Sequence, residues 1–181
     1  MAQTPCKDCP LRKCEFFNPF TAEELSFMQS FKTGELEVTR GTTILMEGSN
    51  SPQLYTVLSG LGTRYKTLEN GRRQVINFLF PGDFIGLQAG VMGAMQHSVE
   101  ASTNMTLCAF RREDLWNLFR DHPDRAYDLT WIGAVEEHFL GETIATIGQR
   151  DGIQRISWAL VRIYQRLHAV GLSKSGFVPL P

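Results

Sequence analysis

The pattern of apolar and polar positions divides the chain into a strand-rich middle and a helical end. Between residues 35 and 110, short apolar or alternating runs are separated by glycines at positions 41, 48, 60, 71 and 82. Glycines at such regular intervals are typical of turns between short antiparallel strands. We therefore predict an antiparallel roll or barrel for this region.

Four strands can be placed within this region, over residues 38–45, 54–58, 63–68 and 74–80. The last two flank Glu69-Asn70-Gly71, and an Asn-Gly pair between two such runs predicts a tight hairpin. Before the first strand, Thr21-Ala22-Glu23-Glu24 combines a helix N-cap with an acidic first turn. This pattern predicts a short helix that ends near Phe31.

After Phe110 the apolar period becomes helical, with a short helix over residues 112–119 and a longer one over 124–148. One stripe of the longer helix, at nearly three-four spacing, is formed by Leu129, Ile132, Glu136, Phe139, Thr143 and Ile147. The stripe is too long for a small domain to cover, which predicts a homodimer interface. Arg150-Asp151-Gly152 breaks the helix, and a further helix is expected over residues 153–169, closed by Gly171.

Composition limits the classes of function. The chain has 181 residues, 43% of them hydrophobic, which is enough for one main domain and an appendage. A formal net charge of -1 is too low for bulk electrostatic binding of nucleic acid. Because the sequence shows neither a membrane-spanning apolar run nor a secretory signal, we expect a cytoplasmic protein with no membrane partner.

The order of these features resembles a known family. Pro81-Gly82-Asp83-Phe84-Ile85-Gly86 follows the strands, and Phe110, the long helix, a break and a second helix come after it. From about residue 20 to 170 this order resembles the CRP/FNR family of bacterial regulators. The resemblance implies an α+β fold: a double-stranded β-roll (a cyclic-nucleotide-binding-like jelly roll) with an N-terminal helix and a long C-terminal dimerisation helix.

The resemblance also implies a division of the chain and its partners. We expect a cysteine-containing loop (1–20), the sensor roll (21–122), the dimerisation helix (123–149) and the start of a C-terminal DNA-binding domain (150–181). The extended apolar end, residues 177–181, suggests that this last domain is truncated. The implied protein is a homodimeric transcription regulator and not an enzyme. It would bind DNA through the missing domain. Arg72-Arg73 at the hairpin tip would be either a solvated turn or a contact for RNA polymerase or for the missing DNA-binding domain.

Cysteines carry the main chemical signal. Cys6, Cys9 and Cys14 form a C-x2-C-x4-C run, and Cys108 lies at the end of the roll. In a cytosolic chain, clustered cysteines favour metal or redox chemistry over disulfides. Oxygen-sensing members of the CRP/FNR family, which this sequence resembles, use three N-terminal cysteines and one internal cysteine. The resemblance therefore implies a [4Fe-4S] cluster bound by these four residues, although the gap before Cys14 is one residue shorter than in the best-known oxygen sensors.

A second candidate site is the effector pocket of the roll, with Gly86, Gln88, His97 and Ser98 as its lining. Cyclic-AMP-binding members of the family have a ligand-binding segment that corresponds here to the stretch beginning Gly82-Asp83-Phe84-Ile85-Gly86. They place a glutamate directly after its last glycine and an Arg-Ser pair further on. Here Leu87 follows Gly86, and His97-Ser98 stands where the pair would be. Cyclic AMP is therefore not expected as the effector.

Three alternatives remain open at this stage. The cysteines could form a thiol switch or a zinc site. They could be structural, in a regulator of the same family that has a small-molecule effector, a haem or no effector. A cupin-like metal enzyme is the outside alternative, although the chain's four histidines are scattered along the sequence.

Overall fold

In this computed structural model, which describes residues 3–14, 17–173 and 175–178, strands occupy the middle of the chain and helices both ends. The helical elements are η1 (Cys6–Asp8), η2 (Pro10–Lys13), α1 (Ala22–Phe31), α2 (Leu87–Met92), η3 (Arg112–Asp114), α3 (Leu115–Asp121), α4 (Pro123–Gln149) and α5 (Gly152–Ala169). The strands are β1 (Lys32–Val38), β2 (Thr43–Leu45), β3 (Gln53–Ser59), β4 (Gly62–Thr67), β5 (Arg73–Leu79), β6 (Phe84–Ile85), β7 (Ser98–Ala101) and β8 (Met105–Arg111).

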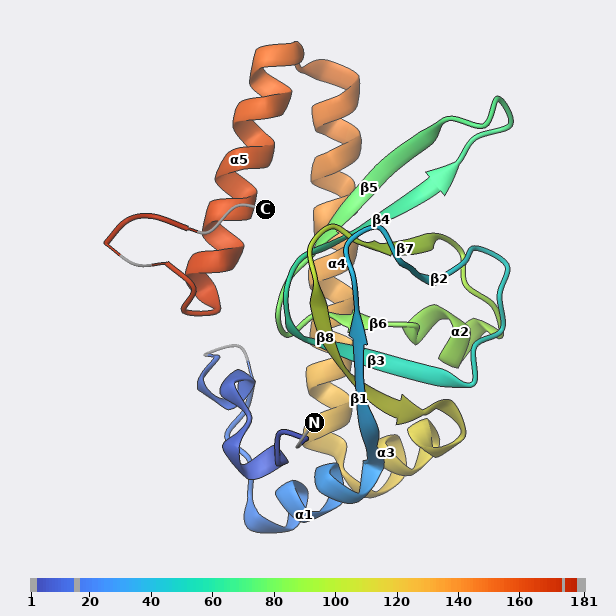
Figure 1. The fold of residues 1–181 in the computed structure, drawn as a ribbon, viewed down its shortest axis with the longest axis vertical. Coiled ribbons are helices and arrows are strands. Elements are labelled where there is room, and N and C mark those ends of the chain that lie inside the picture. The colour runs from blue at the N-terminus through green and yellow to red at the C-terminus, as the bar shows by residue number, and fades with distance from the viewer. Residues whose placement is uncertain (1–2, 15–16, 174, 179–181) are drawn as a thin grey trace.

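The strands form two four-stranded antiparallel sheets that face each other as a roll (Figure 1). One sheet has the order β1-β8-β3-β6 and the other β2-β7-β4-β5. Between them lies an apolar core in which Leu79, Val99 and Leu107 are fully buried. Burial of apolar area in this interior is the main force that holds the sheets together.

A second core lies on the outer face of the first sheet, under α1, α3 and α4. Successive residues of a strand point to opposite faces, so β8 contributes to both cores. Leu107 and Ala109 belong to the roll interior, whereas Cys108 and Phe110 belong to the second core. The Phe110 ring stacks on Phe31 of α1 with ring centroids 5.0 Å apart.

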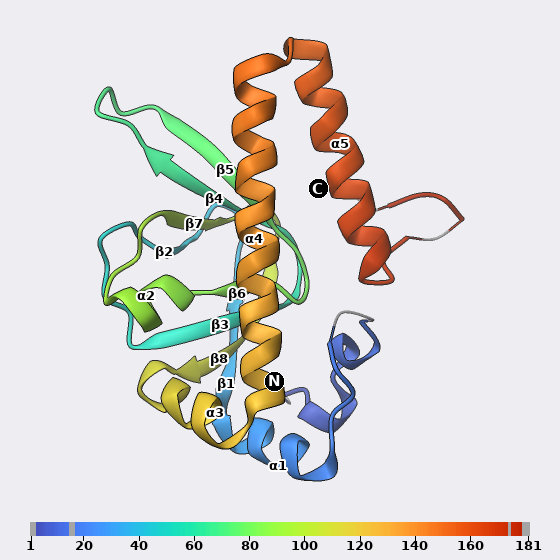
Figure 2. The same ribbon diagram turned by 180° about the vertical axis from the view of Figure 1, so that it is seen from behind.

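Helix α4 runs along the roll, and α5 folds back antiparallel to it (Figures 1 and 2). The break between them is a capping box in which the Asp151 side chain accepts from the N–H of Gln154 at 2.9 Å. Near its far end, α5 meets the N-terminal segment that carries η1 and η2 (Figure 2). Among the described residues, no helix has the length and apolar character that a bilayer crossing requires.

The predicted fold class is confirmed, including the N-terminal helix with its Thr21 capping box and the long helix near the C-terminal end. The predicted hairpin is present as β4 and β5.

One strand prediction is wrong: residues 38–45 do not form a continuous strand, because a turn around Gly41 separates β1 from β2. The N-terminal loop contains the two 3-10 turns η1 and η2, which proline and backbone hydrogen bonds shape locally. The apolar end was expected to span residues 177–181, of which 179–181 lie outside the described residues.

The regular glycines occupy left-handed turns, as their spacing indicated. All five, at positions 41, 48, 60, 71 and 82, have φ between +77° and +94°. Gly60 is also sterically required, because a Cβ built there would lie 2.3 Å from the carbonyl oxygen of Asn104. Gly71 at the hairpin tip has no atom within 4 Å of such a Cβ. The two positions therefore separate the cost of backbone conformation from the cost of crowding.

We predict that Gly60→Ala destabilises the roll by at least about 2 kcal/mol more than Gly71→Ala, which should cost about 1 kcal/mol through its positive φ alone. Urea unfolding followed by circular dichroism measures both values. Equal losses for the two variants would show that the contact with Asn104 can relax without cost.

Candidate functional site

Two short 3-10 turns hold the N-terminal cysteines against α1. Cys6 opens η1, and its backbone N–H donates to Oε1 of Gln29 in α1 at 2.8 Å. Cys9 lies between η1 and η2, and Cys14 directly follows η2. The turns therefore gather three thiols on a short stretch of chain that is attached to the second core.

The fourth cysteine reaches the same region from the sheet. Cys108 lies on the inner strand β8, opposite Glu35 of β1 and Thr56 of β3. Its side chain faces the second core and is buried. Strand alternation therefore brings Cys108 to the outer face of the sheet, where the N-terminal segment packs.

Cys6, Cys9 and Cys108 line one cavity of about 120 Å³, together with Lys32, and we call it the cysteine cavity. The Lys32 side chain is 2% exposed, and its ammonium donates to the Glu35 carboxylate at 2.6 Å. A buried cation beside three thiols favours their deprotonated form when a metal competes for them.

Cys14 lines a different cavity, of about 480 Å³, between η2 and the end of α5. Leu11 of η2 lines both cavities, so they are neighbours. Within residues 3–14, 17–173 and 175–178, no three histidine, cysteine or acidic side chains are grouped closely enough to hold a metal ion. The structure thus brings three of the four predicted ligands to one cavity and leaves the fourth beside it.

Burial determines the protonation of these thiols. Desolvation raises the pKa of all four cysteines, and that of Cys108 to about 11. The unligated thiols are therefore neutral at pH 7, and ligation would release their protons. The donor type, thiolate sulfur from one compact segment and one distant strand, fits an iron–sulfur cluster. Binding would require the four sulfurs to approach one another.

Three of the four predicted effector-pocket residues share a third cavity, which we call the effector cavity. Gly86, Gln88 and His97 line a space of about 230 Å³ between the roll and α4. Gly86 has φ +96° and turns the chain from β6 into α2. Ser98 is instead buried, and its hydroxyl accepts from the N–H of Glu47 at 3.0 Å. Ser98 therefore has a structural contact with the segment after β2.

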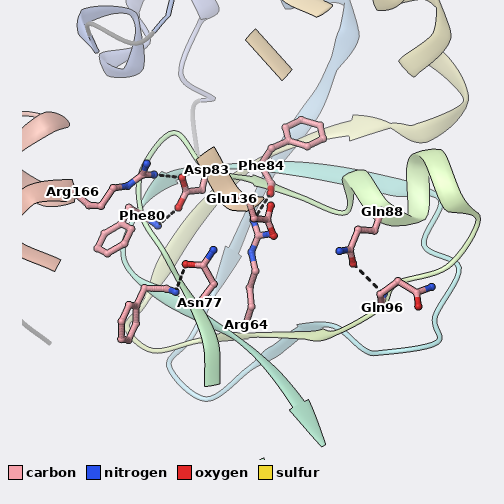
Figure 3. Close-up of polar contacts among 10 residues, drawn as sticks. Arg64, Asn77, Phe80, Asp83, Phe84, Gln88, Gln96, Glu136 and Arg166 are labelled. Carbon is pink, nitrogen blue, oxygen red and sulfur yellow. Dashed lines mark hydrogen bonds and ion pairs between the residues drawn. The ribbon is translucent and has the colours of Figure 1, made fainter. Parts of the chain in front are cut away.

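Arg64 of β4 also lines this cavity. The sequence pattern did not indicate that Arg64 belongs to the site. Its side chain is 6% exposed, donates to the Phe84 carbonyl at 2.8 Å and pairs with Glu136 of α4 (Figure 3). Desolvation lowers the pKa of Arg64 to about 10, so it remains charged at pH 7. Because the residues around Arg64 in β4 are also polar, nothing in the sequence distinguished this inward-facing charge from a solvated one.

Most of the predicted dimer stripe is covered by its own subunit. Ile147 is 42% exposed, but the other five residues face the roll or α5: Leu129, Ile132, Glu136, Phe139 and Thr143. On the outward side of α4, Tyr127 and Ile144 are 62% and 73% exposed. Apolar spacing identified the face that is buried, but not what covers it. Contact of α4 with a second chain stays a prediction.

A buried ionic group joins the N-terminal segment to α4. The Arg125 guanidinium donates to Glu24 of α1 at 3.0 Å and to the Asn18 carbonyl at 3.1 Å, and it pairs with Asp128 at 2.9 Å. Both Arg125 and Asp128 also line the cysteine cavity. The spacing of Arg125 four residues before Leu129 was a sequence signal for this inward-facing charge.

Comparison with known proteins agrees with this architecture. The family model named Cyclic nucleotide-binding domain matches residues 35–122. The transcriptional activator protein FnrL of Cereibacter sphaeroides is 26% identical over 176 residues, which are 94% of this chain and 67% of that protein. The nitrogen fixation regulation protein FixK of Bradyrhizobium diazoefficiens is 26% identical over 97% of this chain and 73% of its own length.

A solved structure supports the fold. The structure of FixK2 from Bradyrhizobium japonicum superposes with a TM-score of 0.70 at 24% identity, covering 81% of this chain and 70% of that one. FnrL and FixK are named as regulators and not as enzymes, in agreement with the prediction that this chain is not an enzyme.

The neutral state of His97 makes a testable contribution to stability. Burial, with Arg64 and Lys66 nearby, lowers the pKa of His97 to about 4 from 6.5. The unfolded chain therefore binds this proton first, so stability is lost as the pH falls from about 6.5 towards 4. Between pH 7 and about pH 4.5 the loss should reach about 2 kcal/mol.

We predict that His97→Gln removes this part of the acid sensitivity, whereas His138→Gln, at an exposed position on α4, leaves it in place. Urea unfolding at the two pH values measures the difference. An acid loss in His97→Gln equal to that of the wild type would contradict a buried neutral imidazole.

Proposed function

Because this chain belongs to the CRP/FNR family of transcription regulators, we propose that it is the sensor and dimerisation region of a DNA-binding regulator that responds to oxygen or redox state. The observation that carries the proposal is the cavity where thiols from the N-terminal segment and β8 meet the start of α4. In this proposal residues 21–122 sense, 123–149 dimerise and 150–181 begin a DNA-binding domain. The regulator acts in the cytoplasm, with DNA and RNA polymerase as its partners.

In this proposal Cys6, Cys9, Cys14 and Cys108 hold one [4Fe-4S] cluster. A bound cluster supplies a centre that oxygen and nitric oxide attack. The fit rests on the thiol donor set, on three thiols already sharing one cavity, and on the buried ammonium of Lys32 beside them. Clustered thiolates carry negative charge. Against the desolvation that raises it, Lys32 lowers the pKa of Cys6, Cys9 and Cys108, and its partner Glu35 opposes this with a smaller effect.

The chain's own residues connect this site to α4. Ligation by Cys6 and Cys9 would hold the N-terminal segment on the second core, where Arg125 links that segment to Glu24 and Asp128. Release of the segment would expose this ionic group and loosen the first turns of α4. A change in the population of the packed α4 would then alter the spacing of two DNA-binding domains.

We further propose that the outward face of α4 forms the dimer contact. Ile144, at 73%, and Tyr127, at 62%, are exposed there. Large apolar side chains exposed to solvent on the outward side of a helix favour a partner surface.

We predict that Ile144→Glu converts a dimer into a monomer, because a charge would be buried between two helices. Ile153→Glu, on the exposed start of α5, is the matched control and should leave the dimer intact. Sedimentation velocity measures both. A wild-type monomer, or an Ile144→Glu variant that sediments as the wild-type dimer, would contradict this interface.

The cluster itself is tested by strictly anaerobic purification. We predict a coloured, iron-containing protein that bleaches in air, and loss of most of the iron in both Cys14→Ser and Cys108→Ser. Ala109→Ser places the same hydroxyl on the same strand but towards the roll interior, and should retain its iron. A colourless, iron-free wild-type protein would overturn the cluster. A cysteine variant with full iron would remove that residue from the ligand set.

A second candidate is regulation by a small ligand in the cavity of Gly86, Gln88 and His97. The observation that favours it is the buried charge of Arg64 on the wall of that cavity. In this case the cysteines would be structural, and an iron-free protein would retain full DNA-binding control.

A further inference from the structure

A fourth cavity, of about 310 Å³, lies where β5 and the loop after it meet α4 and α5. Its walls carry three guanidinium groups and three phenyl rings. Figure 3 shows Arg64, Arg166 and Phe80 among them. We call it the arginine cavity and define it by Arg64, Arg162, Arg166, Phe78, Phe80 and Phe139. Its volume is within the range of small-molecule sites. The pair Arg64–Glu136 lines both this cavity and the effector cavity, and so lies between them.

The charges in the arginine cavity do not balance. Arg64 pairs with Glu136, and Arg166 pairs with Asp83 (Figure 3). Arg162 has no acidic partner within 4.0 Å among the described residues, and its guanidinium contacts Oε1 of Gln165 at 3.5 Å. One positive charge therefore remains without a carboxylate.

Two buried donors in the arginine cavity also lack acceptors. Within the described part of the chain, Nε of Arg64 and Nε of Arg162 are both buried and have no hydrogen-bond partner. The Arg64 side chain is 6% exposed, so water has little access to it. Buried donors without partners are costly, and a bound acceptor would remove that cost.

The phenyl rings give the arginine cavity an apolar side. The Phe78 ring lies edge-on to Phe139, with centroids 6.4 Å apart. The guanidinium carbon of Arg162 lies 5.4 Å from the centroid of the Phe139 ring. That of Arg166 lies at the same distance from the centroid of the Phe80 ring. Guanidinium groups above aromatic rings place donors for an anion next to a surface that accepts a flat apolar group.

We propose that the arginine cavity binds a small organic anion that combines a phosphate or carboxylate with a flat apolar body. Arg162 binds the anionic group, and Phe78, Phe80 and Phe139 contact the body. This site is distinct from the cysteine cavity and the effector cavity, although it adjoins both: it shares Gly82 and Ile132 with the first and the Arg64–Glu136 pair with the second. Because its walls come from the roll, α4 and α5, an occupant favours the arrangement in which α5 lies against the roll.

The test titrates the 181-residue chain with phenyl phosphate as the probe. Binding is measured by NMR, from the chemical-shift changes of the Trp131 and Trp158 indole N–H groups. We expect saturable binding, weaker by at least about tenfold in Arg162→Gln, a loss typical of a charge-assisted contact. Arg155→Gln, an exposed arginine two turns earlier on α5, is the matched control and should bind like the wild type. Benzoate, compared with phenyl phosphate, identifies which anionic group is preferred.

A second variant tests the apolar contact independently. Phe139→Leu keeps the side chain apolar and should weaken phenyl phosphate binding while leaving binding of inorganic phosphate unchanged. No saturation by phenyl phosphate or benzoate up to about 10 mM would overturn the site, as would equal affinities for the wild type and Arg162→Gln. Inorganic phosphate binding as tightly as phenyl phosphate would overturn the role of the rings.

Discussion

Strand β8 supplies side chains to two hydrophobic cores at once, and the rest of the molecule depends on this alternation. Leu107 and Ala109 close the interior of the roll, while Cys108 and Phe110 project into the helical core on the other side. Because β8 lies between β1 and β3 in its sheet, it cannot shift its register without exchanging the two sets. The position of Cys108 in the second core is therefore fixed by the packing of the whole roll.

This constraint connects the candidate sensor to the helix that it would control. The N-terminal segment packs over Cys108, and the same core contains the first turns of α4 through Ala126 and Leu129. Arg125 adds a buried ionic link between them. Breaking one partner of a buried ionic group usually costs several kcal/mol. In the proposed mechanism, a change at the cysteines would act on α4 through this shared core and the Arg125 contacts.

Several parts of this arrangement could be predicted from local chemistry. The capping box at Thr21, the Asn70-Gly71 hairpin and the turn glycines each depend on residues close in sequence, and the structure has all of them. The spacing of Cys6, Cys9 and Cys14 marked them as a group, and Cys108 was added to them only through the family resemblance.

What could not be predicted depends on long-range partners. The apolar period of α4 marked its buried side, but only the folded chain shows that the roll and α5 cover that side. Arg64 lies in a polar strand, so its burial and its pairing with Glu136 follow from the position of α4 and not from its neighbours. The strand over residues 38–45 was predicted as continuous, although Gly41 was among the predicted turn glycines, because β-branched residues on both sides favoured one strand.

Hydrogen–deuterium exchange tests the central claim that the state of the cysteine segment controls the start of α4. The anaerobic protein and the same sample after exposure to air are compared peptide by peptide. The account predicts faster exchange after exposure at residues 3–14 and at 123–132, and unchanged exchange in β3 and β8. Faster exchange at residues 3–14 with no change at 123–132 would contradict it.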